Sequence, residues 1–180
     1  MRADAARNLD RVLSTGARLL AQDPATTIAK IAAEAGVDRG TVYRHFESRE
    51  ALLAAIYKER YDLVEQVIDE ARLTAAPVAM ALYRYVEGII AATRKWPVNL
   101  QQLRSDATIG PRRAQLAARV DAFIERAVAE GLFRPGLPDG WIAALLRGIV
   151  HIAADEYSHL DVAEAAEFAV ESLLRGAGRP

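Results

Sequence analysis

The sequence predicts an all-α fold, with an N-terminal three-helix unit followed by a helical bundle and about nine helices in total. Apolar residues recur every three or four positions along most of the chain, which is the period of an amphipathic helix. The strict alternation of β-strands is missing, and residues that break helices divide the chain at intervals of helix length. The breaks fall at Asp23-Pro24, Gly36, Glu47-Ser48, Pro77, Trp96-Pro97, Gly110-Pro111, 131–139 and from Gly176 onward.

The composition is that of an ordinary globular protein. The chain has 180 residues, of which 52% are hydrophobic and 26% charged. It contains no cysteine, which excludes disulfides, thiolate chemistry and cysteine-ligated zinc. No window reaches the ~18 consecutive apolar residues of a membrane span, and the first twenty residues lack the apolar segment of a secretory signal. We therefore expect a cytoplasmic protein without membrane contact, and no motif indicates a cofactor or a metal.

The net charge of −1 does not by itself indicate a nucleic-acid partner. Residues 1–50 hold 8 Lys+Arg against 7 Asp+Glu, and the remainder holds 15 against 17. Neither part is strongly basic. A contact with DNA must therefore come from a few cations aligned on one face.

The first two helices are predicted at about 3–21 and 27–35. The first has an apolar stripe at helical spacing, formed by Leu9, Val12, Leu13, Ala17 and Leu20. Thr27 is suited to cap the second helix, because its hydroxyl can accept a backbone N–H. Gly36 is suited to end that helix, because a left-handed backbone has little steric cost for glycine.

A third, short helix is predicted at about 39–46. Asp38 is placed to cap it, since the positive end of a helix favours a carboxylate. Val42 and Phe46 are four residues apart and are expected to point inward, while the opposite side is rich in hydrogen-bond donors. Two short helices joined by a glycine turn, the second rich in donors, form the reading unit of a helix-turn-helix.

The donor-rich side of this helix has the chemistry to read DNA in the major groove. Arg39 and Arg44 can offer paired donors to a guanine edge or single donors to phosphates. Gly40 lets the backbone approach DNA closely, and Thr41 can bind a phosphate or pack on a thymine methyl. The predicted DNA-facing residues are Thr27, Arg39, Gly40, Thr41, Tyr43, Arg44, His45 and Arg49. The alternative is structural: three packed helices whose polar face is merely solvated.

These residues resemble the DNA-binding signature of the tetracycline-repressor (TetR) family over about Asn8–Tyr57. The resemblance rests on Ile31-Ala32-Ala33-Glu34-Ala35-Gly36-Val37, Gly40-Thr41-Val42-Tyr43-Arg44-His45-Phe46 and Ser48-Arg49-Glu50-Ala51-Leu52-Leu53. It implies a homodimer that sets its recognition helices in successive major grooves of a near-palindromic operator. It also implies that a C-terminal domain binds an inducer, and that Tyr43, His45 and Arg49 meet phosphates. Arg49 stands where the family often has lysine.

Two domains are expected: a helix-turn-helix domain at 1–50, which continues into a linker helix at 48–73, and a sensing and dimerisation domain at 74–180. The resemblance implies that the last two helices, predicted at 138–160 and 161–175, close the dimer as a four-helix interface. The interface residues predicted are Trp141, Leu145, Gly148, Ile149, Ile152, Val162, Ala166, Val170, Leu173 and Leu174. The alternative is that both helices complete the core of one chain.

Polar and aromatic residues within apolar stretches of the second domain are candidates for effector contacts. They are Tyr83, Trp96, Leu100, Leu103, Arg104, Phe123, His151 and Asp155. Each also has a structural explanation, because aromatic residues at helical spacing usually fill a core and a lone histidine is usually not a ligand contact.

Three functional hypotheses are open. The first is a repressor of transcription released by a small-molecule inducer. The second is a DNA-binding regulator whose C-terminal domain binds a protein partner instead. The third, an enzyme, is disfavoured because the sequence has no Gly-rich phosphate loop, no His-Glu-x-x-His pair and no serine framed as a nucleophile.

Overall fold

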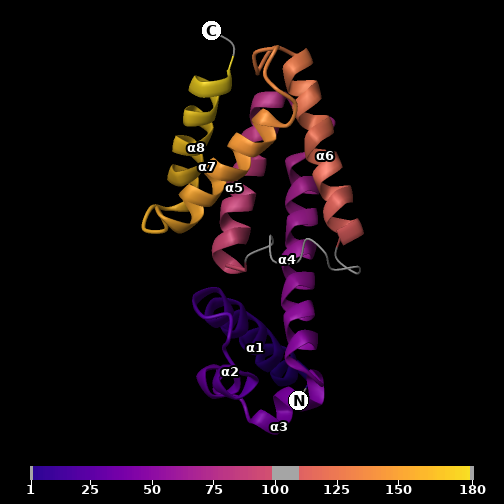
Figure 1. Cartoon of the computed structure of the whole chain (residues 1–180), viewed down its shortest axis with the longest axis vertical. Helices are drawn as coiled ribbons and strands as arrows, with labels where there is room; N and C mark the ends of the chain where they lie inside the picture. Colours follow the sequence, from indigo (N-terminus) through magenta and orange to yellow (C-terminus); the bar gives the residue numbers. More distant parts are fainter. Residues whose placement is uncertain (1, 99–109, 179–180) are drawn as a thin grey trace. The chain divides into compact units, whose positions relative to one another are not determined.

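The computed structural model describes residues 2–98 and 110–178, with side chains from residue 7 onward. Within these ranges the chain is all-α, as predicted, and holds eight helices (Figure 1). They are α1 Arg2–Gln22, α2 Ile28–Ala35, α3 Arg39–His45, α4 Arg49–Ala71, α5 Val78–Lys95, α6 Gly110–Ala129, α7 Trp141–Asp155 and α8 Val162–Ala177. The sequence predicts about nine, and the interval between the breaks at 96–97 and 110–111 lies largely outside the described residues. None of these eight helices is long and apolar enough to cross a membrane.

The internal contacts divide the chain into two compact units. Unit 1 comprises Met1–Tyr61 and Lys95–Arg104, and unit 2 comprises Asp62–Arg94 and Ser105–Pro180. The helix α4 contributes to both, because its residues up to Tyr61 belong to unit 1 and those from Asp62 onward belong to unit 2.

Unit 1 is built around aliphatic side chains of α1, α2 and α4, and α1 packs directly on α2. A glycine allows this close packing: a Cβ on Gly16 of α1 would lie 3.0 Å from Cδ1 of Ile56 and 3.6 Å from Cγ2 of Ile31. Both isoleucines are fully buried, and burial of such a side chain stabilises the fold by ~1.5–3 kcal/mol. The predicted stripe of the first helix faces this core, with Val12, Leu13, Ala17 and Leu20 buried.

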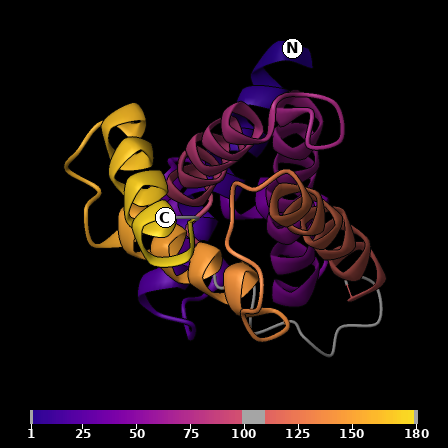
Figure 2. The ribbon, with the colours of Figure 1, turned by 90° about the horizontal axis from the view of Figure 1, so that it is seen from above.

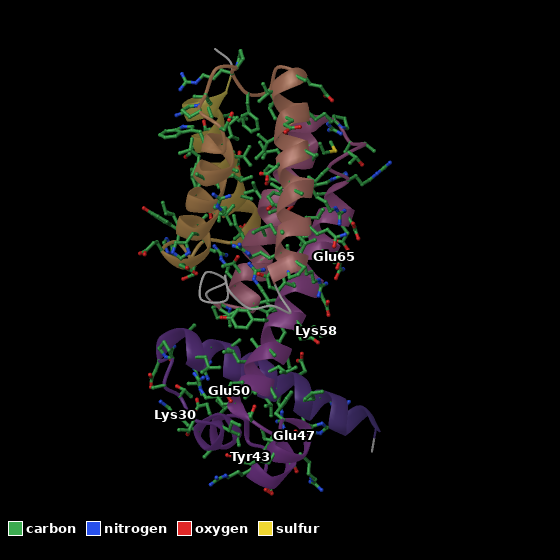
Figure 3. All side chains as sticks on the ribbon, turned by 45° about the vertical axis from the view of Figure 1, so that its right-hand side comes forward. Lys30, Tyr43, Glu47, Glu50, Lys58 and Glu65 are labelled. Atoms are coloured by element: carbon green, nitrogen blue, oxygen red, sulfur yellow. The ribbon has the colours of Figure 1, made fainter. Side chains whose placement is uncertain are left out.

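In unit 2, α6 lies beside α4 (Figures 1 and 2) and is tied to it by arginines. Arg112 forms ion pairs of 2.7 Å with Asp62 and 2.6 Å with Glu65, the latter labelled in Figure 3. The same interval of fifty positions along the chain recurs in three pairs, Arg112–Asp62, Arg119–Asp69 and Arg126–Ala76. Because partly exposed ion pairs contribute only ~0.2–1 kcal/mol each, we infer that Arg112–Asp62 and Arg119–Asp69 set the register of the parallel helices α4 and α6 more than they stabilise them. Ala76 lies beyond the end of α4, and its carbonyl accepts a hydrogen bond from Arg126.

The helices α7 and α8 pack against each other within unit 2 (Figure 2). The start of α7 differs from the prediction: the helix begins at Trp141, after Gly140 in a left-handed conformation (φ 72°), and not at Pro138. Its end differs too, because α7 stops at Asp155 and not near Leu160.

Arg94 of α5 binds the last turn of α7 and the segment that follows it. Its Nη2 donates to the carbonyls of Ala153 and Tyr157, at 3.0 Å each, and its Nη1 donates to that of Leu160 at 2.8 Å. A cation at the C-terminal end of a helix is favoured by the helix dipole and satisfies carbonyls that lack a partner inside the helix.

Candidate nucleic-acid interface

The helix-turn-helix predicted from the sequence is present in unit 1, and its first helix begins and ends where expected. The hydroxyl of Thr27 accepts a hydrogen bond from the backbone N–H of Lys30 at 3.3 Å. Gly36 is left-handed (φ 64°), and the N–H groups of Gly36 and Val37 donate to carbonyls in the last turn of α2, at 3.1 and 3.0 Å. A residue with a Cβ would be strained at position 36, so the turn depends on glycine.

The second helix of the motif, α3, is fixed through one face and its two ends. Val42 and Phe46 are buried, as predicted. The carboxylate of Asp38 accepts the backbone N–H of Gly40 at 2.8 Å, which caps the start of the helix. The backbone N–H of Phe46 donates to the Val42 carbonyl at 2.9 Å at the other end. The buried face and the two ends therefore hold α3 in place, and the side chains of its opposite face are not needed for this.

That opposite face is solvent-exposed and rich in donors. Tyr43, labelled on α3 in Figure 3, is 40% exposed, and Arg39, Arg44 and His45 are exposed as well. Thr41 is half-buried. The predicted reading face is thus open and not tucked into the core.

Two pairs of neighbours order the arginines of this face. The guanidinium of Arg39 lies over the ring of Tyr43, 5.2 Å from its centroid, and its Nη2 is 3.5 Å from the tyrosine hydroxyl. Nη2 of Arg44 donates to the hydroxyl of Thr41 at 2.7 Å. Each guanidinium has five N–H donors in a plane, so these contacts orient the arginine while leaving donors for another molecule.

The last predicted DNA contact, Arg49, lies at the start of α4 and has partners inside the chain. Its Nε donates to the carbonyl of Thr26 at 3.3 Å, and its Nη2 donates to the carbonyl of Pro24. The neighbouring Ser48 caps α4 by accepting the N–H of Ala51 at 3.1 Å. The phosphate contact expected of Arg49 stays a prediction; within the chain its guanidinium binds two backbone carbonyls.

Comparison with known proteins decides what kind of helix-turn-helix this is. A family model described as "Bacterial regulatory proteins, tetR family" matches residues 12–56. The HTH-type transcriptional repressor LfrR of Mycolicibacterium smegmatis is 32% identical over 134 residues, which is 72% of this chain and 68% of LfrR. The chain belongs to the TetR family. It is therefore a transcriptional regulator with a DNA-binding helix-turn-helix.

Solved structures of TetR-family proteins share the fold over nearly the whole chain. The crystal structure of LfrR in complex with proflavine is 25% identical and has a TM-score of 0.65, with 94% of this chain and 96% of LfrR covered. The ketosteroid transcriptional regulator KstR2 of Mycobacterium tuberculosis is 21% identical and has a TM-score of 0.80, with 94% of each chain covered.

In this TetR-family regulator, the aromatic effector candidates belong to both compact units. Trp96 and Phe123 are buried, but Trp96 belongs to unit 1 and Phe123 to unit 2. Tyr83 is half-buried on α5, and its hydroxyl donates to the carbonyl of Ala163 at 3.2 Å. Burial is the main cause that raises the pKa of the Tyr83 hydroxyl, and nearby carboxylates, foremost Glu87, raise this pKa further.

The polar effector candidates on α7 lie on the outside of the chain. The side chain of His151 is 74% exposed, and its Nδ1 lies 2.8 Å from a carboxylate oxygen of Asp155, one turn away. Both residues are exposed in the single chain, and their contact with an effector stays a prediction. The other three candidates, Leu100, Leu103 and Arg104, lie outside the described residues.

The predicted dimer residues divide into exposed and buried groups. Trp141 is 48% and Ile152 49% exposed, and Gly148 is exposed as well. Half-buried members of the prediction are Leu145, Ile149, Val162, Val170 and Leu174. Ala166 and Leu173 are buried within the chain and offer no surface to a partner, which corrects their assignment. They lie on the face of α8 that also buries Ala165, Ala169 and Ala177.

One large exposed residue of this region was missed from the sequence. Phe168 of α8 is 55% exposed, more than any other large hydrophobic residue among those described. The residues predicted for the interface on α8 are Val162, Ala166, Val170, Leu173 and Leu174, and they are all half-buried or buried. A phenylalanine outside that set and among polar neighbours was the available signal.

Proposed function

We propose that this regulator is a repressor that binds a near-palindromic operator as a homodimer and leaves it when a small molecule binds. The observation that carries the proposal is the exposed donor face of α3, on a helix anchored through Val42 and Phe46. Two copies of α3 in successive major grooves would lie about one helical repeat apart, ~34 Å. The proposal assigns DNA binding to residues 1–50 and sensing and dimerisation to 74–180, in a cytoplasmic protein.

Base reading is assigned to the arginines of α3, and positioning on the backbone to its other donors. Arg44, oriented by Thr41, and Arg39, stacked on Tyr43, each keep donors for the edge of a guanine. The hydroxyl of Tyr43 and the ring of His45 are exposed and suited to phosphate oxygens.

Gly40 supports a close approach of DNA to α3. A Cβ at this position would meet its nearest atoms, the carboxylate oxygens of Asp38, at 3.5 and 3.6 Å. These are ordinary contact distances, so packing within the chain does not require a glycine. A side chain at position 40 would instead clash with a DNA backbone or base that approaches α3 closely, which explains a glycine there.

The homodimer is supported by apolar side chains left exposed on α7 and α8. Trp141 and Ile152 of α7 and Phe168 of α8 are each about half exposed. Large apolar side chains exposed on two helices that pack together can mark an interaction site, and most homo-oligomers are closed by two-fold symmetry. The proposed interface therefore differs from the predicted one: it includes Phe168 and leaves out Ala166 and Leu173.

Release by a small molecule is supported by the relative LfrR, which was solved with bound proflavine. In the present chain we assign effector binding to unit 2, with Tyr83 and Phe123 as the described candidates. A ligand shifts a protein between two conformations only through a difference in affinity for them. The effector must therefore bind better to a conformation whose two α3 helices do not match the groove spacing.

Selection of DNA by the purified full-length protein tests the proposal. From a library of random duplexes, we expect enrichment of a motif with two-fold symmetry, bound with an affinity at least ~10³-fold above that for mixed-sequence DNA. A protein that binds all duplexes equally, or none, contradicts the proposal.

A further inference from the structure

We propose that Arg49 is a positioning residue: it closes the helix-turn-helix on itself and so sets the N-terminal end of α2 against DNA, without itself contacting a phosphate. This inference deepens the proposed function and rests on it. Arg49 is a half-buried residue of the first turn of α4, directly after the motif ends.

The side chain of Arg49 links the two ends of the motif, and we call this link the clasp. Thr26 lies just before α2, and Arg49 lies just after α3. The Nε of Arg49 donates to the carbonyl of Thr26 at 3.3 Å, and its Nη2 donates to the carbonyl of Pro24. The guanidinium thus spans 23 and 25 positions of sequence to join the segment before α2 to the helix that follows α3.

The loop that Arg49 holds is already ordered by short-range contacts. The backbone N–H of Thr26 donates to the Asp23 carbonyl at 3.0 Å, and that of Ala25 donates to the Asp23 carboxylate at 2.9 Å. Thr26 itself is buried, with its hydroxyl 3.5 Å from the carbonyl of Leu19. These contacts shape the loop, and Arg49 adds the bonds that join it to α4. Without those bonds the loop should open more often.

An arginine is needed for this clasp, because its planar fork presents donors in two directions at once. Lysine has a single ammonium on a flexible stem and does not reproduce a fork of donors. Both carbonyls are neutral, so the contacts neutralise no charge. The side chain acts here through its shape and its donors, and not through ion pairing.

Thr27 directly follows the segment whose carbonyls Arg49 binds. Arg49 can therefore affect the DNA-binding surface through the position of Thr27. Thr27 is exposed and caps α2 through its hydroxyl. If Arg49 sets where Thr27 and the first N–H groups of α2 lie, its loss displaces these neutral donors and so weakens binding to DNA. Neutral donors release no counterions, so the dependence of affinity on salt is then unchanged.

The test compares Arg49→Lys and Arg49→Met with wild type, and uses Arg18→Lys as the matched control. Arg18 is also an arginine of unit 1, but it is half exposed and pairs with Glu34 at 3.3 Å, a contact that lysine can keep. The probes are the duplex selected by the wild-type protein and a mixed-sequence duplex of the same length. Affinities are measured over a range of salt concentrations, and amide hydrogen exchange is measured at residues 25–28.

We expect both Arg49 variants to lose about tenfold or more in affinity for the selected duplex, while Arg18→Lys binds as wild type. The salt slope of Arg49→Lys should equal that of wild type, and exchange at 25–28 should be faster in both Arg49 variants. In a double-mutant cycle, Thr27→Ala should cost less in the Arg49→Lys background than alone, because the two act on one contact.

Three results would overturn the inference. Wild-type affinity in Arg49→Lys, with a salt slope shallower by about one in Arg49→Met, would make Arg49 a phosphate anchor. Lower melting temperatures without loss of affinity in the folded variants would make it a purely structural residue. Unchanged exchange at 25–28 would show that the clasp holds nothing. If the wild-type protein selects no duplex, the proposed function itself fails, and the exchange data alone still report on the clasp.

Discussion

The hydroxyl of Thr41 accepts a hydrogen bond of 2.7 Å from Nη2 of Arg44, one turn further along α3. Arg44 is exposed, and Thr41 beside the buried Val42 is half-buried. The contact uses one donor of the guanidinium and fixes the direction of the others. A guanidinium held in this way loses less freedom when it meets a base than one that rotates in water.

The first prediction concerns this pair. Arg44→Ala should remove the preference for one base in each half-site, at a cost of roughly 1–3 kcal/mol. Thr41→Val removes the acceptor but keeps the shape, and should weaken the same preference by a smaller amount, whereas Thr41→Ser should retain it. Competition between operator variants measures the preference. Arg18→Ala, which removes an arginine elsewhere in unit 1, is the control, and an unchanged preference in Arg44→Ala would show that α3 reads DNA by other residues.

The second prediction separates the hydroxyl of Tyr43 from its ring. Tyr43→Phe keeps the ring beneath Arg39. It should weaken binding to the selected and the mixed-sequence duplex by the same factor, because a phosphate contact carries no sequence information. Tyr43→Ala also removes the ring, so Arg39 loses its support and base preference should change as well. Equilibrium binding to both duplexes distinguishes the variants. If Phe and Ala behave identically, the stacking of Arg39 on Tyr43 has no role in reading.

The third prediction concerns the turn of the motif. Gly36→Val should destabilise the protein by at least ~1–2 kcal/mol, because a β-branched residue must adopt a left-handed backbone there. Gly176→Ala is the control, since that glycine lies in α8 with no atom within 4 Å of an added Cβ; it should be neutral or slightly stabilising. Thermal unfolding measures both, and equal melting temperatures for Gly36→Val and wild type would refute the turn geometry.

The fourth prediction concerns the dimer. The wild-type protein should be a dimer at micromolar concentration, and a charge on the exposed apolar face, as in Ile152→Glu or Phe168→Glu, should shift it to monomer. Met80→Glu is the matched control, because Met80 is 50% exposed but lies on α5. Light scattering coupled to size exclusion gives the mass. A monomeric wild type, or dimers in both glutamate variants, would contradict the proposed interface.

Much of unit 1 was predictable from the sequence because its signals are local. Thr27, Gly36 and Asp38 act within three residues of themselves, and the spacing of Val42 and Phe46 fixes which side of α3 is buried. The partners of Arg49 were not predictable, because they lie 23 and 25 positions away and depend on how the loop before α2 folds back.

In unit 2 the structure depends more on contacts between helices, which local sequence signals do not specify. The apolar pattern alone overestimates the length of α7, and it carries no sign that Arg94, a residue of another helix, binds the carbonyls of Ala153 and Tyr157. The inward face of α8 consists mostly of alanines, which makes its stripe easy to find but hides that Phe168 lies outside it. Which apolar residues face a neighbour and which face outward depends on packing that periodicity does not specify.

The central claim is that two copies of α3 read guanines in successive major grooves. Methylation interference on the selected duplex measures this directly, since a methyl on guanine N7 blocks an arginine from the groove edge. We predict two symmetric clusters of interfering guanines, about one helical repeat of ~10–10.5 base pairs apart, each lost in Arg44→Ala or in an Arg39 variant. Interference at a single cluster, or none in a duplex that the protein binds specifically, would contradict the account.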